Sequence, residues 1–173
     1  MADASLTPIH SRYIRNETLV GCVFNGVLSV VFAFIVFQGV ASIPLWGPQG
    51  MAVDLIPTVF MITLVGNLIV TVLTRKRLAA GQVPSLAPAS KLGLPRNALL
   101  RMLLLAVLFT AVLVPLSILA LWALRIDALP FWPFVGFKVA YGAAVGALSA
   151  GIVVRAALRD GDRAAQAVPA PQA

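Results

Sequence analysis

The chain has 173 residues, of which 60% are hydrophobic and only 11% are charged, and its mean hydropathy is +0.96. A soluble domain has about 45 to 50% apolar and about 25% charged residues, so this composition excludes a soluble globular protein. It also excludes a disordered chain, because so much apolar surface cannot stay dispersed in water. The composition therefore predicts a protein that resides in a lipid bilayer.

Four segments are long and apolar enough to cross a bilayer, which takes about 20 mostly apolar residues. They are residues 18–40, 55–74, 102–124 and 131–154, and only the last contains a charged residue, Lys138. The first apolar run exceeds the roughly 7 to 15 residues of a signal peptide's apolar region, so we interpret it as a permanent span. The sequence predicts an all-α integral membrane protein with four transmembrane helices.

The positive charges predict the orientation, because Lys and Arg near the ends of spans are retained in the cytoplasm. All Lys and Arg residues except Arg125 and Lys138 precede the first span, separate the second from the third, or follow the fourth. Trp46, Trp122 and Trp132 fall at the opposite boundary, where indoles favour the headgroup layer. We therefore expect a bacterial-type inner-membrane protein with both termini in the cytoplasm.

On these grounds the chain divides into five segments. They are a cytoplasmic N-terminal segment (1–17), a first hairpin (18–74), a basic cytoplasmic linker (75–97), a second hairpin (98–154) and a cytoplasmic tail (155–173). The end of the tail, residues 164–173, is rich in Ala, Pro and Gln and is expected to be disordered.

The two hairpins resemble each other at an offset of 80 or 81 residues. The matches include polar and small residues: Arg15-Asn16 with Arg96-Asn97, Gly66 with Gly146, Arg75 with Arg155, and Gly81 with Gly161. Each unit crosses the membrane twice, so both copies start on the same side and a pseudo-two-fold axis along the membrane normal relates them. The sequence thus predicts two repeated helical hairpins.

Polar residues within spans are costly in lipid and are candidates for a substrate or ion path. Lys138 is the only ionisable one, and its flexible stem can reach toward the level of Asp54, so an ion pair is one expectation. Tyr141 follows on the same helix face. Lys138 either holds an anionic substrate or a proton, or it reaches the outer headgroups.

Asn25 and Asn67, in the first and second spans, lie at similar depths on the cytoplasmic side of the span centres. If the two helices are neighbours, we expect these side chains to hydrogen-bond, which contributes about 0.6 to 2 kcal/mol in a membrane. The alternative is a polar filter or a binding site for a carbonyl-bearing ligand.

Small residues recur at four-residue spacing in the fourth span, at Gly142, Gly146 and Ala150. They let helix backbones approach closely, which supplies association energy between membrane helices. The partner helix belongs either to this chain or to another, so a homo-oligomer or a larger membrane complex is an open expectation.

The charge of +7 is accounted for by the topology, so we expect lipid and not nucleic acid as the cations' partner. Arg75, Lys76 and Arg77 lie at a span end, where they either contact anionic headgroups or serve only to set the orientation. The sequence contains no His/Cys cluster and no Gly-rich phosphate loop, so we expect no metal, no cofactor and no catalytic residues.

Two functional hypotheses follow. The leading one is a non-enzymatic packing or accessory subunit that assembles through small-residue helix faces. The alternative is a transporter or channel for a small solute or ion, which would use the few intramembrane polar residues.

Overall fold

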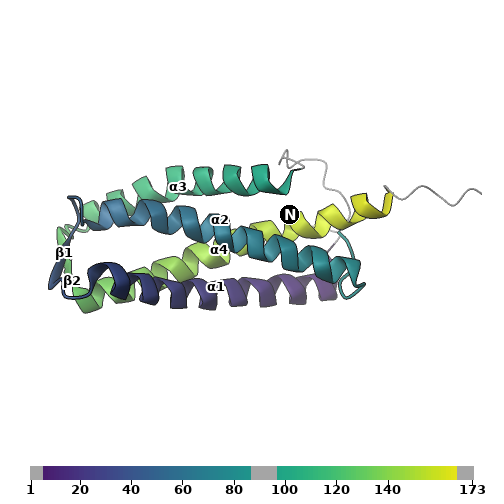
Figure 1. The fold of residues 1–173 in the computed structure, drawn as a ribbon, viewed down its shortest axis with the longest axis horizontal. Helices are drawn as coiled ribbons and strands as arrows, with labels where there is room; N and C mark the ends of the chain where they lie inside the picture. The colour runs from purple at the N-terminus through teal and green to yellow at the C-terminus, as the bar shows by residue number, and fades with distance from the viewer. Residues whose placement is uncertain (1–5, 87–96, 167–173) are drawn as a thin grey trace, which may run out of the picture.

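The structure, a computed structural model, describes residues 6–86 and 97–166, with side chains up to residue 159. Its elements are α1 (Pro8–Phe37), β1 (Ser42–Pro44), α2 (Met51–Ala79), α3 (Ala98–Ala123), β2 (Ala128–Pro130) and α4 (Phe131–Gln166). All four helices are long and apolar enough to cross a membrane, which confirms the prediction of an all-α protein with four such helices. The strands lie at one end of the bundle, called here the sheet end (Figure 1). The start of α1 and the end of α4 lie at the other, the termini end.

The helices continue beyond the apolar runs at the termini end. α1 begins at Pro8 rather than at residue 18, because Thr7 caps it by accepting a hydrogen bond from the backbone N–H of His10 (3.4 Å). The imidazole of His10 accepts in return from the backbone N–H of Thr7 (3.3 Å). α4 extends to Gln166, into the segment expected to be disordered, and residues 167–173 lie outside the described residues.

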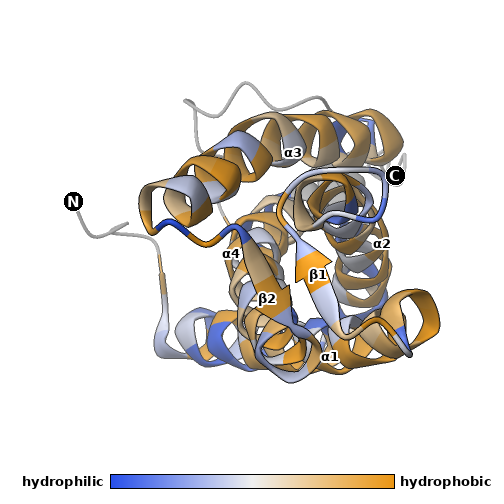
Figure 2. Ribbon diagram, turned by 90° about the vertical axis from the view of Figure 1, so that its left-hand side faces the viewer, coloured by the Kyte–Doolittle hydropathy of each residue, from blue (hydrophilic) through white to orange (hydrophobic). Residues whose placement is uncertain are grey.

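The packing order differs from the chain order. α4 packs against both α1 and α2, and α3 packs against α2, whereas the consecutive helices α1 and α2 touch at few positions. Figure 2 accordingly shows α1 and α3 on opposite sides of the α2–α4 pair. Large apolar side chains remain exposed on the outward helix faces, as expected for surfaces that contact lipid.

A short antiparallel sheet joins the two halves, with Ile43 of β1 opposite Leu129 of β2. Ile43 is fully buried in an apolar cluster that includes Phe37 and Phe134, whose rings meet edge to face at 4.8 Å. The sheet therefore fixes the ends of α1 and α4 against each other.

The first part of the expected linker belongs to the bundle. Residues 75–79 complete α2, and the following residues fold back so that Val83 and Leu86 are buried. The backbone N–H of Leu86 donates to the carbonyl of Leu158 in α4 (3.1 Å). The expected linker cations Lys91 and Arg96 lie outside the described residues.

Candidate functional site

A groove separates α1 from α2, because both helices pack on α4 and hardly touch each other. It consists of two adjoining hollows that share Phe24, Asn25 and Gly66. The hollow toward the sheet end has a volume of about 480 Å³, and the one toward the termini end has about 100 Å³. We call this feature the α1–α2 groove. Its side between α1 and α2 is open, since the rim residues Phe32 and Met61 are each 50% exposed.

Lys138 and Asp54 close the floor of the sheet-end hollow. Nζ of Lys138 lies 2.9 Å from Oδ1 and 2.7 Å from Oδ2 of Asp54, so the expected ion pair is formed. The ammonium also lies over the rings of Phe37 (5.9 Å) and Phe134 (5.7 Å), which favour a cation. Lys138 is only 2% exposed, so it does not extend to headgroups at the surface of the bundle.

The small-residue face of α4 is occupied by α1 of the same chain. A Cβ at Gly146 would lie 2.5 Å from Nδ2 of Asn25 and 2.8 Å from the carbonyl oxygen of Gly21. One at Gly142 would lie 3.1 Å from the carbonyl oxygen of Asn25, and one at Gly21 would lie 3.1 Å from Cβ of Ala150. This face packs within the chain and is covered.

The expected hydrogen bond between Asn25 and Asn67 is not formed, because α1 packs on α4 instead of α2. Asn25 lines the groove and donates from Nδ2 to the carbonyl oxygen of Gly21 in its own helix (2.8 Å). Asn67 is fully buried on another face of α2, and its amide atoms bond to none of the described residues.

Tyr141 also lies apart from the groove. Its hydroxyl accepts a hydrogen bond from Ser117 of α3 (3.0 Å), and its ring stacks on Phe137 at 5.6 Å. The structure therefore brings Lys138, Asp54 and Asn25 together on one groove and leaves Asn67 and Tyr141 in the helix interfaces.

A second ion pair, which the sequence reasoning missed, lies at the termini end of the groove. Glu17 of α1, only 6% exposed, pairs with Arg77 of α2, whose guanidinium lies over the ring of Tyr13 (5.4 Å). The hydroxyl of Tyr13 is hydrogen-bonded to Oγ1 of Thr74 (3.1 Å). These four side chains, which we call the clasp, join α1 to α2.

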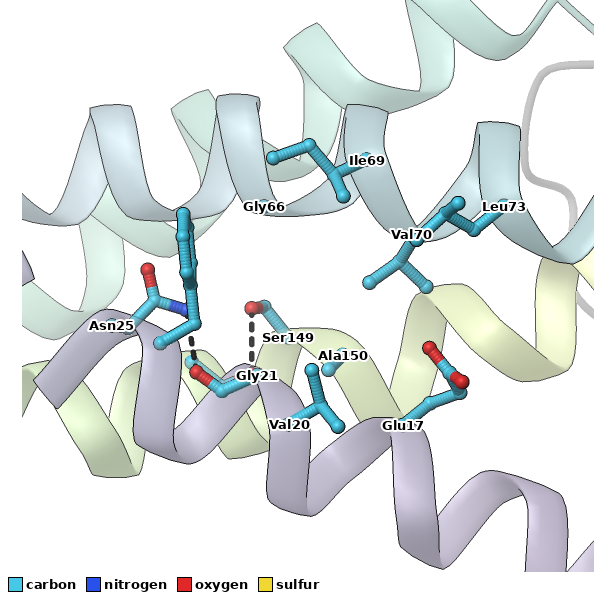
Figure 3. Close-up of a pocket in the computed structure, with 12 residues that line it drawn as sticks. Glu17, Val20, Gly21, Asn25, Gly66, Ile69, Val70, Leu73, Ser149 and Ala150 are labelled. Carbon is cyan, nitrogen blue, oxygen red and sulfur yellow. Dashed lines mark hydrogen bonds between the residues drawn. The ribbon is translucent and has the colours of Figure 1, made fainter. Parts of the chain in front are cut away.

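Figure 3 shows Glu17 at one end of the termini-end hollow and Asn25 at the other. The signal for this site was the spacing of Tyr13 and Glu17, which puts them on one face if the helix is extended toward the N-terminus. Of the basic cluster, Arg77 joins the clasp, whereas Arg75 and Lys76 are exposed at the end of α2.

The groove is lined mainly by apolar side chains. Its charged side chains are each in an ion pair: Asp54 with Lys138 toward the sheet end, and Glu17 with Arg77 at the termini end. In residues 6–86 and 97–159, no cluster of three or more His, Cys, Asp or Glu side chains is placed to hold a metal ion. Such a surface is complementary to an apolar ligand.

Comparison with known proteins gave no match: no family model, no curated protein and no solved structure is similar to this chain.

Proposed function

We propose that this chain is a non-enzymatic accessory protein of the inner membrane that binds a membrane-dissolved apolar molecule in the α1–α2 groove. The observation that carries the proposal is the groove itself, which lies between two membrane-spanning helices with α4 as its floor. Because the small-residue face of α4 already packs on α1, the groove and not that face is the binding surface.

Filling the groove tests this proposal. Gly66 lines both hollows, and a Cβ there would meet only Nδ2 of Asn25, at 3.8 Å, so Gly66→Leu extends into the groove without a backbone clash. The matched control is Ala111→Leu on the exposed face of α3. After purification in mild detergent, mass spectrometry of the extracted small molecules and proteins identifies what each variant carries. We expect a molecule present with the original chain and Ala111→Leu but lost with Gly66→Leu; equal retention by all three contradicts the proposal.

We also propose that both termini lie in the cytoplasm. In support, the basic residues near helix ends, with the exception of Arg125, gather at the termini end, whereas the exposed Trp46, Trp122 and Trp132 belong to the sheet end. Single cysteines test this orientation in a Cys22→Ser background. We expect a membrane-impermeant thiol reagent added to intact cells to label Gln49→Cys but not Gln82→Cys, and the reverse pattern would overturn the orientation.

The proposed duplication has support in the packing. Each half is a helix, a strand and a helix, and the two strands pair antiparallel. α1 packs on α4 as α3 packs on α2, with α2 and α4 together in the middle. These are the pairs that a pseudo-two-fold axis through the α2–α4 contact would relate.

Transport of a small solute or ion is the second candidate, favoured by the convergence of Lys138, Asp54 and Asn25 on one groove. Ion flux into proteoliposomes discriminates between a transporter and a binding protein. A transporter would show flux above that of empty vesicles, and the double variant Asp54→Leu/Lys138→Met would lose it. We expect no such flux from a binding protein.

A further inference from the structure

We infer that the α1–α2 groove holds one acyl chain of a phospholipid from the leaflet at the sheet end. The inference rests on the proposed function and names the class of its ligand. It follows from where the groove lies, how large it is and which of its ends is shut.

The position of the groove decides what surrounds it. The rim residues Phe32 and Met61 are half exposed on helices that cross the membrane, so the groove opens toward the hydrocarbon layer. An unfilled hollow there would deprive its lining of dispersion contacts, and water would find few hydrogen-bonding partners on the mainly apolar walls. Hydrocarbon chains are the neighbouring molecules that can restore those contacts.

The volume of the sheet-end hollow decides between a lipid chain and a partner helix. A helix about 10 Å across would fill 480 Å³ within about 6 Å of its length, little more than one turn. A polymethylene chain is roughly 4 to 5 Å across, so the same volume takes it over about 25 Å, more than the roughly 15 Å depth of one leaflet. The hollow therefore has room for an acyl chain over the whole depth of a leaflet, but for little more than one turn of a transmembrane helix.

The two ends of the groove determine the direction of the chain. At the termini end the hollow shrinks to about 100 Å³, and the clasp of Glu17 with Arg77 and of Tyr13 with Thr74 ties α1 to α2. At the sheet end the larger hollow begins beside Asp54, which lies in the first turn of α2. The acyl chain accordingly runs from the sheet end toward Phe24, and its headgroup stays at the membrane boundary.

Lipid retention tests the inference. The full chain is delipidated, exchanged into vesicles of phosphatidylethanolamine and phosphatidylglycerol, and extracted again in mild detergent. Bound phospholipid per protein is then measured by phosphorus analysis and mass spectrometry. We expect Gly66→Leu to retain about one phospholipid fewer than the original chain, since one chain occupies the hollow, and Ala111→Leu to retain as much as the original.

A second variant keeps the test decisive if Gly66→Leu folds poorly. Thr58→Phe enlarges another wall residue of the sheet-end hollow and should cause the same loss. Equal phospholipid retention by all properly folded variants overturns the inference. If the groove variants instead lose a free fatty acid, an isoprenoid or a co-purifying protein, the groove binds something else and only the phospholipid assignment fails. If they lose nothing of any kind, the proposed function fails as well.

Discussion

Gly146 of α4 lies so close to Asn25 of α1 that a Cβ at position 146 would stand 2.5 Å from the side-chain nitrogen of Asn25. Packing at this distance brings two helix backbones together and maximises the dispersion contacts that hold helices to each other in lipid. The face of α1 that carries Gly21 and Asn25 therefore packs on α4. The groove between α1 and α2 lies beside this interface, because α1 packs on α4 and touches α2 at few positions.

Gly146→Ala should therefore weaken the α1–α4 interface. The added methyl group has to displace Asn25 or the backbone of Gly21, and overpacking of this kind costs about 1 to 3 kcal/mol. Unfolding by denaturing detergent in mixed micelles measures the change in the free energy of unfolding. Gly136→Ala is the matched control in the same helix, because a Cβ there has no neighbour within 4 Å. Equal stability of the two variants would show that the α1–α4 contact is looser than described.

The four helices could be predicted from the sequence because hydrocarbon thickness imposes a minimum length on an apolar run. The helix ends could not, since capping determines them and the cap of α1 lies in polar sequence. The side chain of Thr7 and the ring of His10 extend α1 to Pro8, well before the first apolar residue of the span.

The pairing of helices could not be predicted either. Apolar residues are spread around the whole circumference of α2 and α3, so the pattern of apolar residues does not say which face meets protein and which meets lipid. The assumption that consecutive helices are neighbours led to the pairing of Asn25 with Asn67, which is wrong here. The ion pair of Lys138 with Asp54 was accessible to sequence reasoning because both residues lie near the same boundary.

Substitutions of Lys138 and Asp54 should have strongly non-additive effects on the free energy of unfolding. Removing either charge leaves the other buried without its counter-ion, so Asp54→Leu and Lys138→Met should each lower stability by about 3 to 5 kcal/mol. The double variant replaces the pair by apolar side chains and should recover most of that loss. A double-mutant cycle in mixed micelles measures the coupling. Additive losses would mean that the pair contributes nothing as a unit.

The buried polar residues of α2 predict opposite effects for the same type of substitution. Oγ1 of Thr63 is buried without a hydrogen bond to any described residue, whereas Oγ1 of Thr74 bonds to the hydroxyl of Tyr13. Thr63→Val removes an unsatisfied group and should stabilise by about 1 kcal/mol, while Thr74→Val removes the hydrogen bond to Tyr13 and should destabilise by about the same amount. Unfolding midpoints of the two variants give the sign directly. A loss of stability in Thr63→Val would indicate that its hydroxyl has a partner in the membrane.

The end of α3 predicts a stabilising substitution. Arg125 has φ of 56°, the left-handed conformation in which a side chain is strained. Two backbone hydrogen bonds close the end of α3 at this residue. The N–H of Arg125 donates to the carbonyl oxygen of Trp122 (2.9 Å), and the N–H of Ile126 donates to that of Leu121 (3.0 Å). α2 ends in the same way, but there Gly81 occupies the left-handed position with φ of 67°.

Arg125→Gly should therefore raise the free energy of unfolding by about 1 kcal/mol, because glycine adopts this conformation without a steric cost. Arg125→Ala is the control: it removes the same charge but keeps a Cβ, so it should give no comparable gain. Gly81→Ala should lose about what Arg125→Gly gains, since it introduces the strain that the first substitution relieves. If Arg125→Ala stabilises as much as Arg125→Gly, the benefit comes from removing a cation at the sheet end and not from the backbone.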